Sequence, residues 1–302
     1  MPLIDSHTHF FSRPFFAALA KVSPHPGDIE HKLAALSTAT GIEIPSPDLA
    51  AHLRRWLQQL DSNKIDKAVS FASLPEEVPA VLEAARTSNG RLIPFSVLDP
   101  TQPGAPERAA HLLGDGFRGL VFFPALHHYP LEGEAFAACF KEIAQSRAVA
   151  LVHCGLLEIK LRDLLGLPKR VDLRYANPLS LIPAAQAHPG AAIVLPHFGG
   201  GFFREALMAG ALCPNLHLDT SSSNSWLKTQ PAGLDLAGVI RRSLEVFGPK
   251  RLLFGTDSGT FPRGWRRDIC DLQRKLFIEA GLAPENLDLV FGGNALRLCG
   301  AN

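Results

Sequence analysis

The feature of this sequence that most constrains its fold is an eightfold alternation of short apolar runs with longer helical patterns. Several of the runs, such as AVALV, AAIVL and RLLF, are continuously apolar, as expected for parallel strands that are buried on both faces. We predict eight strands, at Leu3–Asp5, Lys67–Phe71, Leu92–Val97, Gly119–Phe123, Val149–Val152, Ala192–Leu195, Leu216–Leu218 and Leu252–Gly255.

Helical patterns fill the intervals between these strands, at Leu49–Leu60, Glu76–Thr87, Pro106–Leu113, Glu134–Ser146, Leu179–Ala187, Phe203–Ala211, Leu234–Phe247 and Trp265–Ala280. No low-complexity linker interrupts them, so the sequence predicts an α/β fold, one (β/α)₈ TIM-barrel domain over residues 1–302. We expect an extra C-terminal helix around Pro284–Leu298. The segment Phe11–Pro47 is too long for a simple strand-to-helix connection, and we expect a loop excursion over the barrel mouth.

Composition excludes several classes of partner. The net charge of +1 gives no basic excess for a phosphate backbone, so we expect no nucleic-acid partner. The N-terminus lacks the pattern of a signal peptide, and no apolar stretch approaches the roughly 20 residues that span a bilayer, so we expect no membrane partner. Five widely spaced cysteines without a C-x-x-C pair fit reduced thiols, and we expect a cytoplasmic protein.

Polar side chains follow several of the predicted strands. The first strand runs into Asp5-Ser6-His7-Thr8-His9. On an extended chain, side chains two positions apart point to the same face, so His7 and His9 converge on one point inside the barrel. An H-x-H pattern alone is a weak signal, because two such histidines also occur as polar surface residues.

Three further candidates end other strands. His153 ends the fifth strand, His197 ends the sixth, and Asp257 ends the eighth. The active site of such a barrel lies at the C-terminal ends of its strands, so these side chains meet at one rim. Taken singly, each histidine could have a purely structural role, as a hydrogen-bonded residue at a strand end. Together they favour a metal or catalytic site.

The pattern D-x-H-x-H on strand one, H on five, H on six and G-T-D on eight resembles the amidohydrolase superfamily. It is most similar to the amidohydrolase-related branch, which contains aminocarboxymuconate-semialdehyde decarboxylase, resorcylate decarboxylases and dicarboxylate lactonases. The resemblance implies that the metal ligands are His7, His9, His153 and Asp257. It also implies that His197 is an acid/base group that touches the bound water or substrate.

The number and kind of metal ion follow from two observations. Binuclear members of the superfamily place a carboxylated lysine at the end of strand four, whereas Gly119–Pro124 contains no lysine, which favours one metal. Three imidazoles and one carboxylate suit Zn²⁺, with Mn²⁺ as the other option. Zinc lowers the pKa of bound water to about 7, and Asp257 is a second candidate, beside His197, to take the proton of that water.

Loop residues supply candidates for substrate binding. Arg263, Arg174 and Arg13 follow strands eight, five and one, and a guanidinium binds a substrate carboxylate with two hydrogen bonds. Each of them could equally be a surface arginine that has no role in substrate binding. The serines Ser221–Ser223 lack a G-x-S-x-G elbow, so we expect them to hydrogen-bond within the loop or to substrate rather than to act as nucleophiles.

These observations leave three functions open. The first is a metal-dependent hydrolase that acts on a small polar molecule with a lactone, ester or amide bond. The second is a non-oxidative decarboxylase or hydratase that uses the same metal on a small carboxylic acid. The third is a binding protein with a degenerate site, which the complete ligand set argues against. In each case the partner is a small molecule, and homo-oligomerisation stays open.

Overall fold

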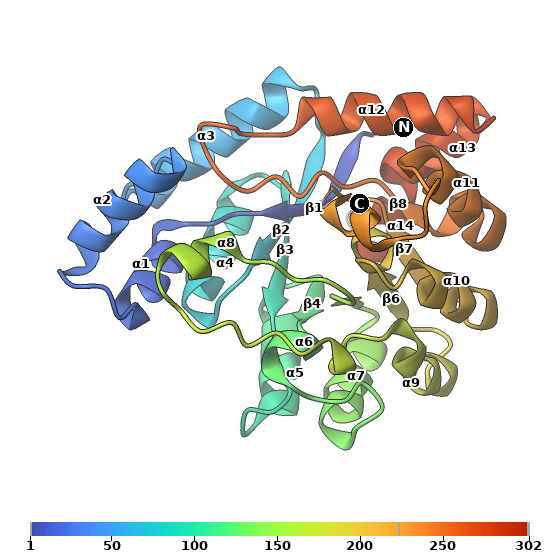
Figure 1. Cartoon of the computed structure of the whole chain (residues 1–302), viewed down its shortest axis with the longest axis horizontal. Helices are drawn as coiled ribbons and strands as arrows, with labels where there is room; N and C mark the ends of the chain where they lie inside the picture. Colours follow the sequence, from blue (N-terminus) through green and yellow to red (C-terminus); the bar gives the residue numbers. More distant parts are fainter. Residues whose placement is uncertain (1, 223, 301–302) are drawn as a thin grey trace.

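The computed structural model describes residues 2–222 and 224–300. Eight parallel strands follow one another in chain order around a barrel (Figure 1). The strands are β1 (Ile4–His9), β2 (Lys67–Ala72), β3 (Leu92–Val97), β4 (Gly119–Phe122), β5 (Val149–Val152), β6 (Ala192–Leu195), β7 (Leu216–Asp219) and β8 (Leu252–Leu253). The predicted (β/α)₈ barrel is therefore confirmed, with every strand at its expected place.

The barrel closes between β1 and the chain that follows β8. Backbone hydrogen bonds join Ser6 N to Phe254 O at 2.9 Å and Asp257 N to His7 O at 2.9 Å. A further bond joins His9 N to the carbonyl oxygen of residue 258 at 2.8 Å. β1 extends four residues beyond the predicted end, because this pairing continues to His9. The closure therefore fixes His7 and His9 beside Asp257.

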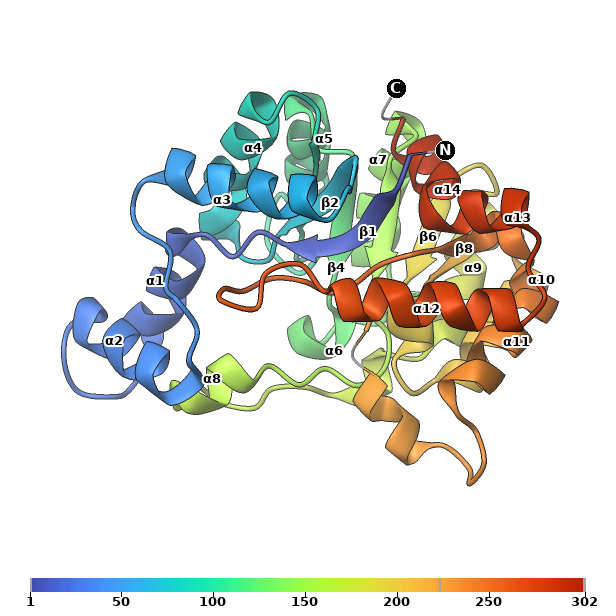
Figure 2. The same ribbon diagram turned by 90° about the horizontal axis from the view of Figure 1, so that it is seen from above.

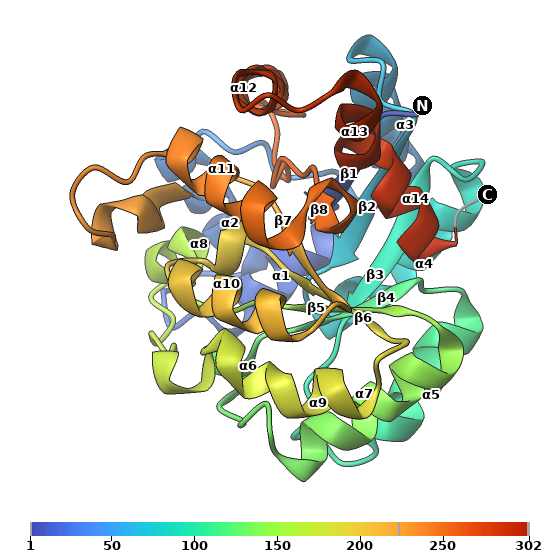
Figure 3. The ribbon, with the colours of Figure 1, turned by 90° about the vertical axis from the view of Figure 1, so that its right-hand side faces the viewer.

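Helices cover the outside of the barrel, and in Figure 3 they surround the centrally placed strands. They are α3 (Leu49–Ser62), α4 (Val78–Thr87), α5 (Ala105–Asp115), α7 (Glu134–Ser146), α9 (Ile182–Ala187), α10 (Phe203–Leu212), α11 (Leu236–Phe247) and α12 (Arg267–Glu279). Two short helices, α6 (Pro124–His127) and α8 (Lys160–Leu164), follow β4 and β5 instead and contribute residues to the cavity described below. α7 illustrates their pattern, since it buries Phe136, Cys139, Phe140 and Ile143, which share one helical face.

A second apolar layer fills the barrel itself. It contains Val69, Val121 and Val194 from the strands together with Ala295 and Cys299 from α14 (Asn294–Cys299). The tail therefore closes the end of the barrel at which the strands begin. α13 (Pro284–Asp288) and a π-helical turn (Leu289–Gly293) lead into α14, so the predicted C-terminal extra helix is present as three joined pieces.

The N-terminal excursion is helical, which corrects the prediction of a loop. It contains α1 (Arg13–Val22) and α2 (Ile29–Thr40). Pro14 occupies the first turn of α1, where a missing N–H costs nothing, and the Asp28 carboxylate caps α2 by accepting from His31 N. Proline and polar residues, which suggested a loop, thus mark helix starts. Figure 2 shows α1, α2 and α8 grouped beyond the end of β1.

Within residues 2–222 and 224–300, no helix is both long and apolar enough to cross a membrane. All five cysteines are buried and carry free thiols. Burial raises the pKa of the Cys154 thiol, so this neighbour of His153 is uncharged and packs as a small apolar side chain.

Candidate metal centre

His7, His9 and Asp257 lie together at the C-terminal rim of the barrel. One ligand atom from each lies within 4.8 Å of the others. Oδ1 of Asp257 is 3.2 Å from Nε2 of His9 and 3.7 Å from Nε2 of His7. Two atoms bound to one tetrahedral zinc ion are about 3.4 Å apart. The spacing of these three side chains therefore fits joint coordination of one small cation.

The backbone that delivers this cluster is constrained. The extended β1 directs both imidazoles to one face, as the H-x-H spacing predicts. Asp257 has a positive φ of 58°, a conformation that non-glycine residues rarely adopt. Strained residues of this kind persist where the surrounding structure holds them, and they gather at functional sites.

His153 and His197 flank the cluster. The His197 ring lies 4.8 Å from that of His7 and 5.1 Å from that of His153, measured between centroids. His153 is outside the tight group of three, but it lines the same cavity. Its Nδ1 is buried without a hydrogen-bond partner among the described residues. A buried polar atom without a partner is costly, and a cation in the cavity would supply that partner.

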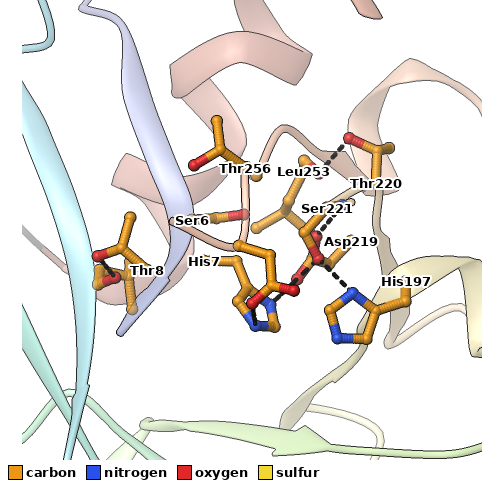
Figure 4. Close-up of polar contacts among 12 residues, drawn as sticks. Ser6, His7, Thr8, His197, Asp219, Thr220, Ser221, Leu253 and Thr256 are labelled. Carbon is orange, nitrogen blue, oxygen red and sulfur yellow. Dashed lines mark hydrogen bonds and ion pairs between the residues drawn. The ribbon is translucent and has the colours of Figure 1, made fainter. Parts of the chain in front are cut away.

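A carboxylate orients His7. Nδ1 of His7 donates a hydrogen bond of 2.5 Å to Oδ2 of Asp219, the last residue of β7 (Figure 4). Because a carboxylate only accepts, this bond fixes the tautomer of the neutral imidazole, with the proton on Nδ1 and the lone pair on Nε2, the atom nearer Asp257. Metal-binding histidines usually donate their second N–H in this way. The sequence analysis missed Asp219, although its position at a strand end was the signal that identified Asp257.

Serine side chains contact two of the other three imidazoles, those of His9 and His197. Oγ of Ser73 lies 2.8 Å from Nδ1 of His9. Oγ of Ser221 lies 2.8 Å from Nδ1 of His197 (Figure 4). The backbone N–H of Ser221 also donates to Asp219. Ser221 therefore forms hydrogen bonds within the site, one of the two roles that the sequence suggested. Ser223 lies outside the described residues.

Burial controls the charge of the histidines. It lowers the pKa of His153 and of His197, with the neighbouring histidines adding to the effect. It also lowers the pKa of His9, although the hydrogen bond to the Asp257 carboxylate acts in the opposite direction. These three imidazoles are therefore neutral near pH 7, which is the form that binds a metal or accepts a proton.

The charges of two other groups are set by their partners. Burial lowers the pKa of His7, but the charge and hydrogen bond of Asp219 outweigh it and leave the pKa raised. Burial raises the pKa of Asp257, but the His9 hydrogen bond and the nearby imidazoles outweigh it and leave the pKa lowered. Asp257 is therefore a carboxylate at neutral pH, as a metal ligand must be.

Gly255 allows the side chains of His7 and Asp219 to approach each other closely. A Cβ atom at this position would lie 2.8 Å from Cβ of His7 and 2.9 Å from Oδ1 of Asp219. Both contacts are shorter than ordinary van der Waals separations, and both partners are held by other bonds. The glycine in the G-T-D sequence thus makes room for the hydrogen-bonded pair of His7 and Asp219.

A cavity of about 690 Å³ opens from this cluster. Arg263 lines it, as do Lys160 and Arg162 of α8, which the sequence analysis did not consider. The other two arginines predicted to bind substrate, Arg13 and Arg174, are not among the residues that line this cavity. Arg13 is paired with Glu30 and Pro45 O, and the largely exposed Arg174 is paired with Asp172.

The fold and this cluster define a class, the (β/α)₈-barrel proteins with a histidine–aspartate site suited to a divalent metal ion. A model of the amidohydrolase family matches residues 4–300, and the chain belongs to this family. The search of curated proteins found no match.

Solved structures resemble this chain over nearly their whole length. A probable 2-pyrone-4,6-dicarboxylic acid hydrolase from Acinetobacter baumannii is 15% identical, with a TM-score of 0.63 and coverage of 99% of this chain and 100% of that one. A 5-carboxyvanillate decarboxylase from Sphingomonas paucimobilis is 15% identical, with a TM-score of 0.65 and 99% of each chain covered. A zinc-bound amidohydrolase from Burkholderia multivorans is 18% identical, with a TM-score of 0.61 and 99% of each chain covered. At these identities the likeness shows the fold alone.

Proposed function

We propose that this protein is a metal-dependent hydrolase that cleaves a lactone, ester or amide bond with an activated water molecule. One divalent ion, Zn²⁺ or else Mn²⁺, would be held by His7, His9, His153 and Asp257. The observation that carries the proposal is the spacing of His7, His9 and Asp257, with ligand atoms within 4.8 Å of one another. The buried Nδ1 of His153, without a described partner, supports a fourth ligand.

A metal ion at this site supplies Lewis acidity, which lowers the pKa of water towards neutrality and polarises a carbonyl group. The chain supplies the proton transfer. The Nδ1 of His197 is occupied by Ser221, so its Nε2 is the atom left to take a proton from water and return it to the leaving group. The lowered pKa of His197 keeps this imidazole neutral and ready to accept. Asp257 is the second candidate for this role.

The cavity also offers a cation for an acidic substrate. Arg263 lines the cavity, and Asp257 is among the charges that act on its guanidinium. A guanidinium there would pair with a substrate carboxylate. The similar 2-pyrone-4,6-dicarboxylic acid hydrolase acts, by its description, on a substrate with two carboxyl groups. We propose a small-molecule substrate with at least one carboxylate and a cytoplasmic location for the protein.

The second candidate is a non-oxidative decarboxylase, in which a carbon–carbon bond breaks, carbon dioxide leaves and a proton takes its place. Fifteen of the 28 residues lining the cavity are apolar, and an apolar environment destabilises a carboxylate relative to neutral carbon dioxide. The similar 5-carboxyvanillate decarboxylase carries out a reaction of this class.

One experiment tests the proposal against this alternative. Zinc-loaded protein is incubated with a panel of lactones, esters, amides and aromatic acids, and product masses are read directly. We expect a mass gain of one water in a lactone, or the two halves of an ester or amide, and no turnover with His197→Ala although that variant keeps its metal. Carbon dioxide release would replace the hydrolase proposal with the decarboxylase, and normal turnover by His197→Ala would remove the acid/base role.

A further inference from the structure

The cavity has a second part that the metal chemistry does not use. We define the apolar arm as the side chains of Phe11, Phe15, Leu19 and Ile42, all of which line the cavity and belong to the N-terminal excursion. Thr40 is the remaining lining residue from this excursion. The described residues of the excursion therefore contribute no charged group to the cavity. A part of a ligand that contacts these four side chains therefore contacts an apolar surface.

The apolar arm starts at the metal centre itself. The ring of Phe11 stacks on that of His9, with centroids 4.6 Å apart and an interplanar angle of 9°. Phe15 stacks on Phe11 in turn, at 4.3 Å and 30°. A continuous aromatic surface therefore leads from an imidazole of the candidate metal centre towards α1 and Leu19.

The local backbone holds Phe11 in this position. Phe11 has a positive φ of 38°, which is unusual for a bulky residue. Its ring lies over Gly259, where a Cβ atom would come within 2.7 Å of Cε2. A strained backbone and a glycine beneath the ring indicate that the surrounding structure determines this placement.

The wall is preformed rather than assembled by a ligand. Phe15 and Leu19 are only 5% and 4% exposed, and they pack with Leu33 of α2 and Leu165 after α8 in one apolar cluster. Such a wall loses little conformational freedom when a ligand binds, so apolar burial against it is converted efficiently into affinity. The volume of about 690 Å³ accommodates a drug-sized molecule.

We propose that the substrate carries a hydrocarbon chain: its polar reacting end lies at His9 and Asp257, and its chain lies along Phe11, Phe15 and Leu19. This assignment of substrate class rests on the proposed function for its reacting end. It adds a hydrocarbon chain to the small polar substrate expected from the sequence, because the apolar arm can bury such a chain while the polar group lies at the other end of the cavity.

Titration calorimetry of the zinc-loaded protein with straight-chain hydroxamates tests the proposal. The hydroxamate group binds the metal, and the chain is lengthened from acetohydroxamate through butano- and hexano- to octanohydroxamate. Burial of one CH₂ group is worth about 0.8 kcal/mol, so affinity should rise about threefold to fourfold for each carbon added. Equal affinities of acetohydroxamate and octanohydroxamate would overturn the proposal.

A matched pair of variants locates the chain. Ile42→Asp places a charge in the apolar arm at a half-buried position, whereas Ile29→Asp places the same charge on the surface of α2, away from the cavity lining. We expect Ile42→Asp to weaken octanohydroxamate binding at least tenfold and to leave acetohydroxamate binding unchanged, which also shows that the variant is folded. Ile29→Asp should bind both as the wild type does. An equal effect of the two variants would contradict the assignment.

A failure of the metal centre is distinguishable from a failure of the apolar arm. If the protein binds no zinc, the proposed function fails, and the arm is tested by titrating octanoate and acetate into the metal-free protein. Octanoate binding that exceeds acetate binding and is lost in Ile42→Asp would support the arm by itself. Octanoate binding no tighter than that of acetate would overturn it.

Discussion

The hydrogen bond between His7 and Asp219 gives the sharpest test of how this site is organised. Replacement of Asp219 by asparagine keeps the shape of the side chain but removes its charge. The amide can present its NH₂ group to His7, which then loses the partner that fixes its tautomer. Since Nδ1 donates over 2.5 Å in the native site, Asp219→Asn should leave Nε2 less available to a metal ion.

The size of the effect follows from the role of such partners. Removal of a group that orients a metal-binding histidine typically costs 10–100-fold in metal affinity, about 1.4–2.7 kcal/mol. We expect the upper half of this range, because His7 is 2% exposed and Asp219 is fully buried, so water cannot replace the lost acceptor.

Competition with a coloured chelator measures the zinc affinity of the full-length protein. The matched control is Asp172→Asn, since the Asp172 carboxylate is paired with the exposed Arg174 at the surface. Thermal unfolding of the metal-free proteins separates lost coordination from lost stability. Unchanged zinc affinity in Asp219→Asn would refute the reasoning, whether or not the variant is less stable.

Three further variants test other parts of the account. Gly255→Ala forces a Cβ atom against His7 and Asp219, so zinc affinity should fall at least tenfold in the chelator assay. Burial lowers the pKa of His217 to about 3 in the folded protein, so the native state stays neutral while the unfolded chain takes up a proton below pH 6.5, and stability is lost as pH falls. His217→Leu should remove about 1.1 kcal/mol per pH unit of this loss on average between pH 6.5 and 5, measured by urea unfolding. Arg263→Ala should raise KM for an acidic substrate at least tenfold and leave zinc content unchanged, as measured by kinetics and metal analysis.

Much of the architecture could be predicted because the barrel strands are buried on both faces. Continuous apolar runs mark β5, β6 and β8, and the polar residues that end them, His153, His197 and Asp257, stand out against such runs. The rim at which they meet follows from the parallel topology. The local sequence pattern and the geometry of the barrel therefore predict the same position for the site.

The parts that the sequence did not reveal depend on contacts between distant segments. Asp219 becomes important only because closure of the barrel brings β7 beside His7. The excursion could not be recognised as helical because Pro14 and Asp28, which mark helix starts, also resemble loop residues. Its apolar side chains line the cavity, and this placement depends on how α1 packs against the segment after α8.

The most direct test of the account is the zinc content of the purified protein, measured by elemental analysis together with anomalous X-ray scattering at the zinc edge. The account predicts one zinc ion per chain, within coordination distance of His7, His9, His153 and Asp257, and a chain nearly free of zinc in His153→Ala. A protein that takes up no zinc or manganese, or an ion bound away from these four residues, would contradict it.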